Sequence, residues 1–543
     1  MDTTDLTEGR KLYRTVSACL IVVFSLKNVF TICMEVAVLG SILSSALCIL
    51  PEDIVRVHLF SDILFVLALA NLAQSIFGVR LSVMHTTSFL LLCPILYYLN
   101  LPANKCPSQG DLYAMGPVQR TLEWQSRLHQ LHGCFILIAG DLYAMGPVQR
   151  SLEWQSRLHQ LHGCFILIAV CQSLFSIRRL YTCLTRLISP ISLISCVIFL
   201  PIALLDTIVD KCSKNIFLSM GTIMLFSIVA YNTNCFKVKI CDVKINVCSV
   251  FSIFITVSIA WLICFLITWF DLVSTISPVR TDYHSSMLRY IDYVYHYPRL
   301  FQWGYPKFSL SAVTIIVPSV LVTIPFSVES YREAKHLQGK RDTNGNISKG
   351  LLVDALCSML NVILGSVTGT QVSYESIQDI AETKIWKRSI VQLSSVLLLV
   401  ISIWTRLSAY ITLIPEPLLG ALLTILCVQQ VAGCGRVLST RVDILSRRNV
   451  YIIIMSILLP MLLDHGLAAL SMPHNTHMSR LILVVTMTTL LDHVTSDQSV
   501  SADTLDLVSA QPARAHNLEA NDTLNECVSS LEQVTCCCLS CLV

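Results

Sequence analysis

The residues of this chain that could do chemistry gather between positions 365 and 388. This stretch lies between two long apolar runs, yet it carries glycines, hydroxyl residues and the carboxylates Glu375, Asp379 and Glu382. Polar, glycine-containing backbone at membrane depth is tolerated only where protein or a water-filled cavity shelters it, and ionisable groups there are candidate functional groups. A short helix that begins near Ser373 would direct its free N–H groups into such a cavity and bind an electronegative ligand. The alternative is a plain polar loop between two helices.

The composition is that of a membrane protein. Hydrophobic residues make up 54% of the chain and charged residues only 13%, with a mean hydropathy of +0.66, whereas about a quarter of a soluble globular chain is charged. The net charge of +3 is too small to indicate nucleic-acid binding. The 23 cysteines are scattered and lack the spacing of a zinc site or of a disulfide framework. No nucleophile–base pair or phosphate-binding loop is evident, so we do not expect an enzyme.

The apolar runs approach the length of about 20 residues that a bilayer requires. They predict an all-α polytopic membrane protein, with the stretch at 373–382 as one further, broken segment. The first run is long enough for one helix or two. The predicted spans are 16–50, 57–78, 83–100, 162–178, 185–205, 215–232, 249–271, 309–331, 350–365, 389–413, 417–434, 449–470 and 480–492.

Basic residues give the predicted orientation. If 16–50 is a single crossing, the basic clusters all fall on the side of the N-terminus, which the positive-inside rule makes cytoplasmic. Residues 1–15 are then a cytoplasmic N-terminus, 16–493 the transmembrane domain, and the polar residues 494–543 a disordered cytoplasmic tail. The clusters are Arg10, Lys11 and Arg14; Arg178, Arg179 and Arg186; Lys237, Lys239 and Lys244; Arg332, Lys335, Lys340, Arg341 and Lys349; Lys384, Lys387 and Arg388; and Arg436, Arg441, Arg447 and Arg448.

A tandem duplication occupies the predicted exterior loop. Residues 110–139 recur at once as 140–169, with only Thr121 changed, to Ser151. Solenoid units diverge and number at least about three, so this is no repeat architecture. We interpret 110–139 as a duplicated exon or an artefact of the gene model. The paired histidines within each copy have metal-like spacing, but we expect no metal site.

The run from Glu375 to Lys384 resembles the signature of the nucleobase–ascorbate transporter family (solute carrier family 23 and its xanthine–uracil permease relatives). Glu375 and the Thr383–Lys384 end fit that signature, while Ser376 and Gln378 stand where the family has Asn and Gly. Further segments are similar to the family in the same order along the chain, from about residue 20 to about 490. These are GVRL (78–81), Ser189–Pro190, YPRLFQWGYP (297–306), IPEPLLGALLTI (414–425) and SRRN (446–449).

The resemblance implies a fold and an activity. The fold would have about 13–14 transmembrane segments in a seven-plus-seven inverted repeat, with core and gate domains and a substrate site near the midplane. The protein would be a symporter in the plasma membrane that moves a small molecule, a nucleobase or ascorbate, with sodium or protons as the coupling ion. Family members often form homodimers. This chain departs from the pattern, as a divergent member.

The resemblance also suggests substrate-binding residues. Glu375 is a residue that the family accepts at the first signature position, where a carboxylate would accept hydrogen bonds from ring N–H groups, and Ser376 would add a hydroxyl. The small hydroxyl residue of the third helix falls at Thr87, next to Phe89. His85 stands where ascorbate-type members carry Gln.

Two other segments depart from the family. Phe326 replaces the substrate-binding Glu of the eighth helix, and Glu329, one turn along, either substitutes for it or faces cytoplasmic water beside Arg332. In the first helix Lys27 stands where the family has Gln. A buried Lys27 would need a partner, for which Glu35 and Glu375 are the candidates.

Two functions therefore compete. The first is secondary active transport of a nucleobase or ascorbate, with Glu375 and Glu329 binding the substrate or the coupling ion. The second is a degenerate, non-transporting family member or a faulty gene model, which the replacement at Phe326 and the short last span favour. An anion exchanger on the same fold is the least favoured interpretation, because such proteins lack the Glu375–Lys384 signature.

Overall fold

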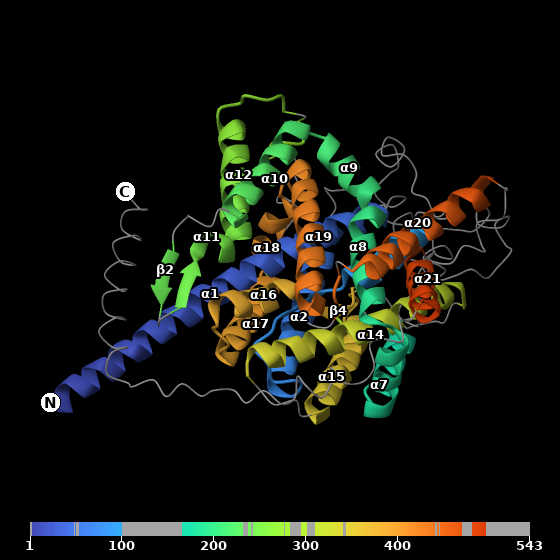
Figure 1. Ribbon diagram of the computed structural model, residues 1–543. Coiled ribbons are helices and arrows are strands. Elements are labelled where there is room, and N and C mark those ends of the chain that lie inside the picture. The colour runs from blue at the N-terminus through green and yellow to red at the C-terminus, as the bar shows by residue number, and fades with distance from the viewer. Residues whose placement is uncertain are drawn as a thin grey trace.

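The computed structural model describes most of the chain as helices (Figure 1). The described residues are 3–47, 49, 54–99, 165–231, 237–240, 243–275, 277–282, 295–300, 310–339, 344–366, 368–439, 442–444, 446–469 and 480–495. Among them, seven helices are long and apolar enough to cross a membrane, or up to eight if a bent pair at Phe165–Phe175 and Arg178–Leu187 counts as one span.

The first half of the chain forms long helices separated by short strands. In chain order the elements are α1 (Thr3–Ala46), α2 (Ile54–Ile76), β1 (His85–Thr87), α3 (Phe89–Leu99), the helix Phe165–Phe175, α7 (Arg178–Leu187), α8 (Pro190–Ala203), α9 (Leu205–Ser213), α10 (Ile216–Tyr231), β2 (Lys237–Ile240), β3 (Val243–Asn246), α11 (Val247–Val250) and α12 (Ser252–Trp269).

The second half begins with the same order of elements as the first: two long helices, a strand of three residues and a short helix. Its elements are α14 (Leu310–Leu337), α15 (Asn344–Ile363), β4 (Thr370–Val372), α16 (Tyr374–Thr383), α17 (Arg388–Ile403), α18 (Thr405–Thr412), α19 (Glu416–Ser439), α20 (Arg447–Ala469) and α21 (Arg480–Val494).

The predicted helical membrane fold is confirmed. The first apolar run is a single helix, α1, as the orientation from basic residues requires. Several predicted spans are instead interrupted. Among them, 83–100 divides into β1 and α3, 185–205 divides between α7 and α8 at Ile188–Ser189, and 389–413 divides into α17 and α18 at Trp404. The strands form two small antiparallel pairs, β1 with β4 and β2 with β3.

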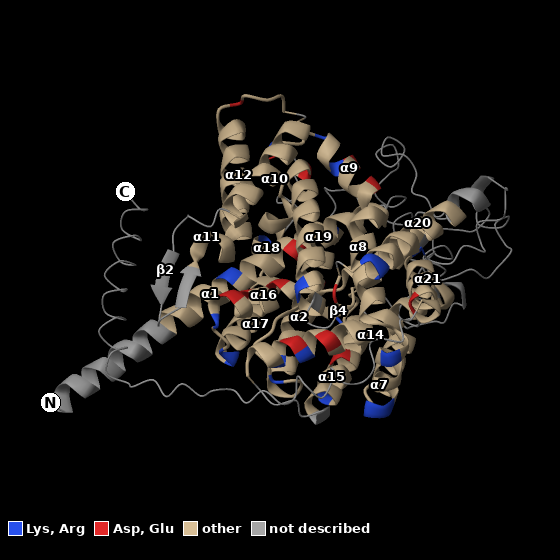
Figure 2. Ribbon diagram, viewed as in Figure 1, with Lys and Arg blue, Asp and Glu red and all other residues tan. Residues whose placement is uncertain are grey.

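The apolar core extends through most of the described helices, with α17 packed against both α1 and α2. The upright helices α10 and α12 (Figure 1) instead expose apolar side chains: Phe217 is 87% and Trp269 is 71% exposed. Such a surface suits contact with lipid, because lipid imposes no cost on exposed apolar side chains. Figure 2 shows the same division. Charged residues lie on α14, α15 and α16 and next to them, whereas α10 and α12 are uncharged over almost their whole length.

Several predictions concern parts of the chain outside the described residues. These are nearly all of the duplication (110–139 and 140–169), the tail from residue 496 on, and the aromatic segment from residue 301 to 306.

Candidate functional site

Two chain segments meet at the centre of the molecule through the strands β1 and β4. The strands pair antiparallel, with His85 opposite Val372, Thr86 opposite Gln371 and Thr87 opposite Thr370. Each strand leads directly into a short helix, β1 into α3 and β4 into α16. Because the strands run in opposite directions, the N-termini of α3 and α16 both face this strand pair. We call β1, β4 and the first turns of α3 and α16 the crossing.

Hydrogen bonds continue beyond both ends of the strand pair. At one end the Ser88 amide donates to the carbonyl of Gly369 (2.9 Å). At the other end the Ser373 amide donates to the carbonyl of Met84 (2.9 Å), and the Met84 amide donates to Oγ of Ser376 (3.0 Å). The crossing is therefore held by backbone bonds at a place where irregular backbone needs partners within the protein.

Two buried hydroxyls at the crossing have no hydrogen-bond partner within the described part of the chain. They belong to Thr87 and Thr370, which face each other across the strand pair. A buried polar atom without a partner costs about 1–3 kcal/mol, so such atoms call for an explanation. These two unpaired hydroxyls lie at the end of the strand pair where α3 begins, an arrangement that could bind the oxygens of a polar ligand.

The helix predicted to begin near Ser373 is confirmed as α16, and the plain-loop alternative is wrong. Ser373 is its N-cap, with the side chain accepting from the Ser376 amide (3.3 Å). At the other end Thr383 donates to the carbonyl of Asp379 (2.6 Å), and Lys384 caps the helix in the left-handed conformation (φ 56°). The two signature residues Thr383 and Lys384 thus end the helix and lie away from the crossing.

A buried ion triad joins α1 to α16. Nζ of Lys27 lies 2.7 Å from Oε1 of Glu375 and 2.6 Å from Oδ2 of Asp379, and the Lys27 side chain is only 3% exposed. Glu375 was one of the two predicted partners of Lys27. The second partner, Asp379, was not predicted; it lies four residues after Glu375 and therefore on the same face of the helix.

The other predicted partner of Lys27, Glu35, has a different contact. Its carboxylate accepts a hydrogen bond from the hydroxyl of Thr86 on β1. This hydrogen bond ties the face of β1 that carries Thr86 to α1. Thr87, the residue after Thr86, points to the opposite face of the strand.

The residues predicted on the eighth helix lie on α14. The ring of Phe326 packs edge-on against that of Tyr374, at the first residue of α16, with ring centroids 4.6 Å apart. Glu329 is buried, and its Oε1 accepts from Nη1 of Arg332 at 2.6 Å. Phe326 is thus close to the start of α16, and Glu329 is held one turn further along α14. Phe89, the first residue of α3, is buried in the main apolar core.

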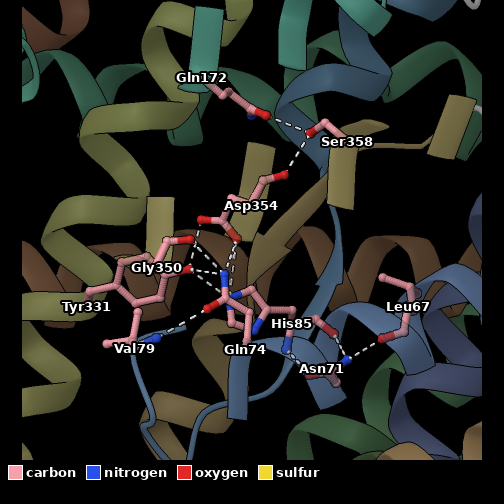
Figure 3. Close-up of polar contacts among 10 residues, drawn as sticks. All are labelled: Leu67, Asn71, Gln74, Val79, His85, Gln172, Tyr331, Gly350, Asp354 and Ser358. Atoms are coloured by element: carbon pink, nitrogen blue, oxygen red, sulfur yellow. Dashed lines mark hydrogen bonds and ion pairs between the residues drawn. The ribbon is translucent and has the colours of Figure 1, made fainter. Parts of the chain in front are cut away.

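A second polar network, which the sequence did not predict as a unit, lies next to β1 (Figure 3). Oη of Tyr331 donates to Oδ2 of Asp354 (2.8 Å) and lies 2.9 Å from Nε2 of His85. Nε2 of Gln74 donates to Oδ1 of Asp354 (2.6 Å). The side-chain nitrogen of Asn71 donates to the carbonyl of His85 (2.8 Å), and its side-chain oxygen accepts from the amide of His85 (2.6 Å).

The structure joins the elements that carry most of the predicted site. Thr87 and Phe89 come from β1 and α3, Glu375 and Ser376 from α16, and Phe326 packs against α16 from α14. Glu329 forms an ion pair with Arg332 on the same helix. Asp354 was missed, although one carboxylate within an otherwise apolar span is a signal that could have found it.

The chain resembles known permeases over most of its length. A family model described as Permease family matches residues 20–466. Solute carrier family 23 member 2 of Rattus norvegicus is 24% identical over 434 residues, which are 77% of this chain and 62% of that protein. Solute carrier family 23 member 1 of Mus musculus is 21% identical over 429 residues, 76% of this chain and 66% of that protein.

A plant relative is more similar over a shorter segment. Nucleobase-ascorbate transporter 11 of Arabidopsis thaliana is 34% identical over 152 residues, which are 28% of this chain and 21% of that protein. The matched region thus spans less than two thirds of the length of these curated relatives. At these identities the chain resembles a divergent member, as the broken signature predicted.

Proposed function

We propose, from the premise that this chain belongs to the Permease family, that it is a secondary transporter for a nucleobase. Alternating movement of a core bundle against a gate bundle would carry the substrate past the crossing, with a cation gradient as the driving force. We place the protein in the plasma membrane and propose a homodimer, as the family resemblance implies.

The observation that carries this proposal is the pair of unsatisfied hydroxyls at the crossing. Thr87 and Thr370 lie opposite each other at the end of the strand pair where α3 begins, Thr87 two residues before the first residue of α3 and Thr370 four residues before that of α16. Ring carbonyl groups of a nucleobase are acceptors that match both the hydroxyl donors and the helix N-termini. Phe326 and Tyr374 also place two packed aromatic rings at the start of α16, and aromatic rings pack well against planar groups.

The charges around the crossing favour a nucleobase over ascorbate. Glu35, Glu375 and Asp379 surround it, and Asp354 is linked to β1 through Tyr331, whereas Lys27 is the one ammonium in these contacts among the described residues. Ascorbate is an anion at neutral pH, and excess negative charge in a low-dielectric site disfavours an anion. A neutral nucleobase meets no such repulsion.

One observation favours the second candidate, a non-transporting family member. Phe326 stands where the family resemblance implies a substrate-binding Glu, and its ring packs on Tyr374. In this candidate the aromatic pair fills space that a substrate would need.

Uptake measurements decide between the two. The chain, with and without residues 110–139, would be expressed at the cell surface and tested with labelled uracil, xanthine, hypoxanthine and ascorbate. Transport predicts saturable uptake of a nucleobase. Absence of uptake from both surface-delivered forms would contradict transport, and Phe326→Glu would then test whether the lost carboxylate restores it.

The hydroxyl pair provides the specific test. Replacing both Thr87 and Thr370 by Val keeps the side-chain shape and removes both hydroxyls, so uptake at low substrate concentration should fall about tenfold. Thr256→Val is the matched control, because Thr256 on α12 is equally buried and its hydroxyl also has no partner among the described residues. Equal effects of the two changes would mean that the crossing does not bind the substrate.

A further inference from the structure

The network beside β1 contains a basic nitrogen, Nδ1 of His85, that is buried and accepts no hydrogen bond from the described part of the chain. The hydroxyl of Tyr331 donates its proton to Asp354 (2.8 Å), so it can only accept from His85 at 2.9 Å. Nε2 of His85 must therefore carry the hydrogen of the neutral ring. This assignment leaves Nδ1 with its lone pair, and Nδ1 is buried without a hydrogen-bond partner within the described part of the chain.

The counter-charge for a protonated His85 is already in place. Asp354 accepts from Tyr331 on one oxygen and from Gln74 on the other, and that second oxygen lies 3.7 Å from Nε2 of His85. Burial disfavours a charged carboxylate, and the two hydrogen bonds from neutral donors offset part of this cost without cancelling the charge of Asp354. A positive charge on His85 would thus find a carboxylate that no ammonium or guanidinium neutralises in the contacts of Figure 3.

Three carboxylates on α14 and α16 are already paired with basic side chains. Glu375 and Asp379 share the ammonium of Lys27, and Glu329 is paired with Arg332. An ammonium held by two carboxylates takes the place that a sodium ion would take between them. Removing it would leave buried charges uncompensated, which is costly.

We propose that the coupling ion of this transporter is a proton and that it binds to Nδ1 of His85; this rests on the proposed function. The proton leaves a hydronium ion, which becomes water, and forms an N–H bond with the lone pair of Nδ1. The ring becomes imidazolium while Asp354 stays ionised. Release to the other side of the membrane reverses the step, so that one proton crosses per cycle.

The position of His85 connects the proton to the substrate. His85 and Thr87 are two residues apart on β1, so both side chains lie on the same face of the strand, opposite Thr86. The ionisable groups near His85 are Tyr331 on α14 and Asp354 and Cys357 on α15, with Glu35 of α1 bound to Thr86 behind the strand. Charge on His85 therefore acts directly on the strand that carries the proposed substrate hydroxyl.

The test uses the full chain in liposomes, with labelled uracil and xanthine as separate probes. Uptake would be driven by an inward pH gradient with choline as the only external cation, or by an inward sodium gradient at equal pH, with the membrane potential clamped. We expect the pH gradient to stimulate uptake about tenfold per pH unit at most, and the sodium gradient to have no effect. Stimulation by sodium alone would overturn the proposal.

His85→Gln removes the titrating nitrogen and keeps an amide of similar reach toward Tyr331. It should abolish the response to the pH gradient, whereas substrate counterflow, which needs no gradient, shows that the variant is folded and inserted. Tyr331→Phe, which breaks the link to Asp354, should weaken the response in the same direction. His336→Gln is the matched control, since His336 is exposed at the end of α14.

The outcomes separate this inference from the proposed function. If the unmodified chain shows no counterflow of either probe, the proposed function fails and this inference falls with it. If counterflow is present but the pH response survives in both His85→Gln and Tyr331→Phe, the transporter stands and His85 is not the proton-binding residue.

Discussion

The two segments that form the crossing share one backbone design but differ in chemistry. Each is a strand of three residues followed by a short helix, β1 with α3 and β4 with α16. The helix α3, FLLLCPILYYL, has no charged residue, whereas α16 carries Glu375, Asp379 and Glu382 in ten residues. The first segment is therefore held by apolar packing, and the second is held by charge as well as by its buried residues Tyr374, Ile377 and Ile380.

The difference lies in what each helix contacts. The residues of α3 belong to the main apolar core and pack against α14 and α8. The carboxylates of α16 are tied to basic residues on other helices, Lys27 on α1 at 2.7 and 2.6 Å and Arg436 on α19 at 3.8 Å. We conclude that the geometry of α16 depends in part on a few charged residues, any of which can be removed singly, while that of α3 depends on many small apolar contacts.

The largest effect should come from removing Lys27. Lys27→Met keeps the length of the side chain but leaves Glu375 and Asp379 buried beside each other without a cation. Breaking a buried ion pair by removing one partner costs about 3–5 kcal/mol. We expect a clearly lower thermal midpoint of the purified protein in detergent. Lys214→Met is the control, because Lys214 is exposed.

A triple variant sharpens this prediction. Adding Glu375→Gln and Asp379→Asn to Lys27→Met removes all three charges, and a neutral set in this position should recover most of the lost stability. An unchanged midpoint in Lys27→Met alone would contradict the view that charge holds α16 in place.

The sequence predicted those parts of this arrangement that have a local signal. Apolar runs gave the spans, Ser373 indicated the start of α16, and a lysine within an apolar helix indicated a buried carboxylate partner. The same local reasoning could have added Asp379, which shares a helix face with Glu375. It could not have given the pairing of β1 with β4, because strands of three residues have no periodicity long enough to recognise.

The network around His85 shows the other limit. Gln74, His85, Tyr331 and Asp354 lie on four elements, and each by itself is compatible with an ordinary packed or capped position. Only the three-dimensional arrangement places their polar atoms within hydrogen-bond distance of one another. The role of Glu329 remained open in the sequence for the same reason; its contact with Arg332 depends on side-chain direction.

A smaller effect should come from Gly433, where α19 packs against α16. A Cβ atom at this position would lie 2.6 Å from Cβ of Tyr374, which no rotation of the Tyr374 side chain can relieve. Gly433→Ala should therefore displace the start of α16 and cost about 1–3 kcal/mol, with reduced uptake of nucleobase. Gly435→Ala is the control on the same helix, since nothing lies within 4 Å of the added atom. Equal uptake in both variants would contradict a tight fit between α19 and α16.

The smallest effect distinguishes stability from function. Ser373 and Ser189 are both N-caps whose side chains accept from the amide three residues on, one at α16 and the other at α8. Replacing either by Ala should cost about 1 kcal/mol, because one amide at the helix start loses its partner. Ser373→Ala alone should also lower nucleobase uptake, since the amide that it frees belongs to Ser376 at the crossing, whereas Ser189→Ala should leave uptake unchanged. Thermal midpoints and initial uptake rates measured on both variants check this. Equal losses of uptake in Ser373→Ala and Ser189→Ala would mean that the start of α16 only stabilises its own segment. The charged and apolar halves of the crossing would then differ only in how they are stabilised.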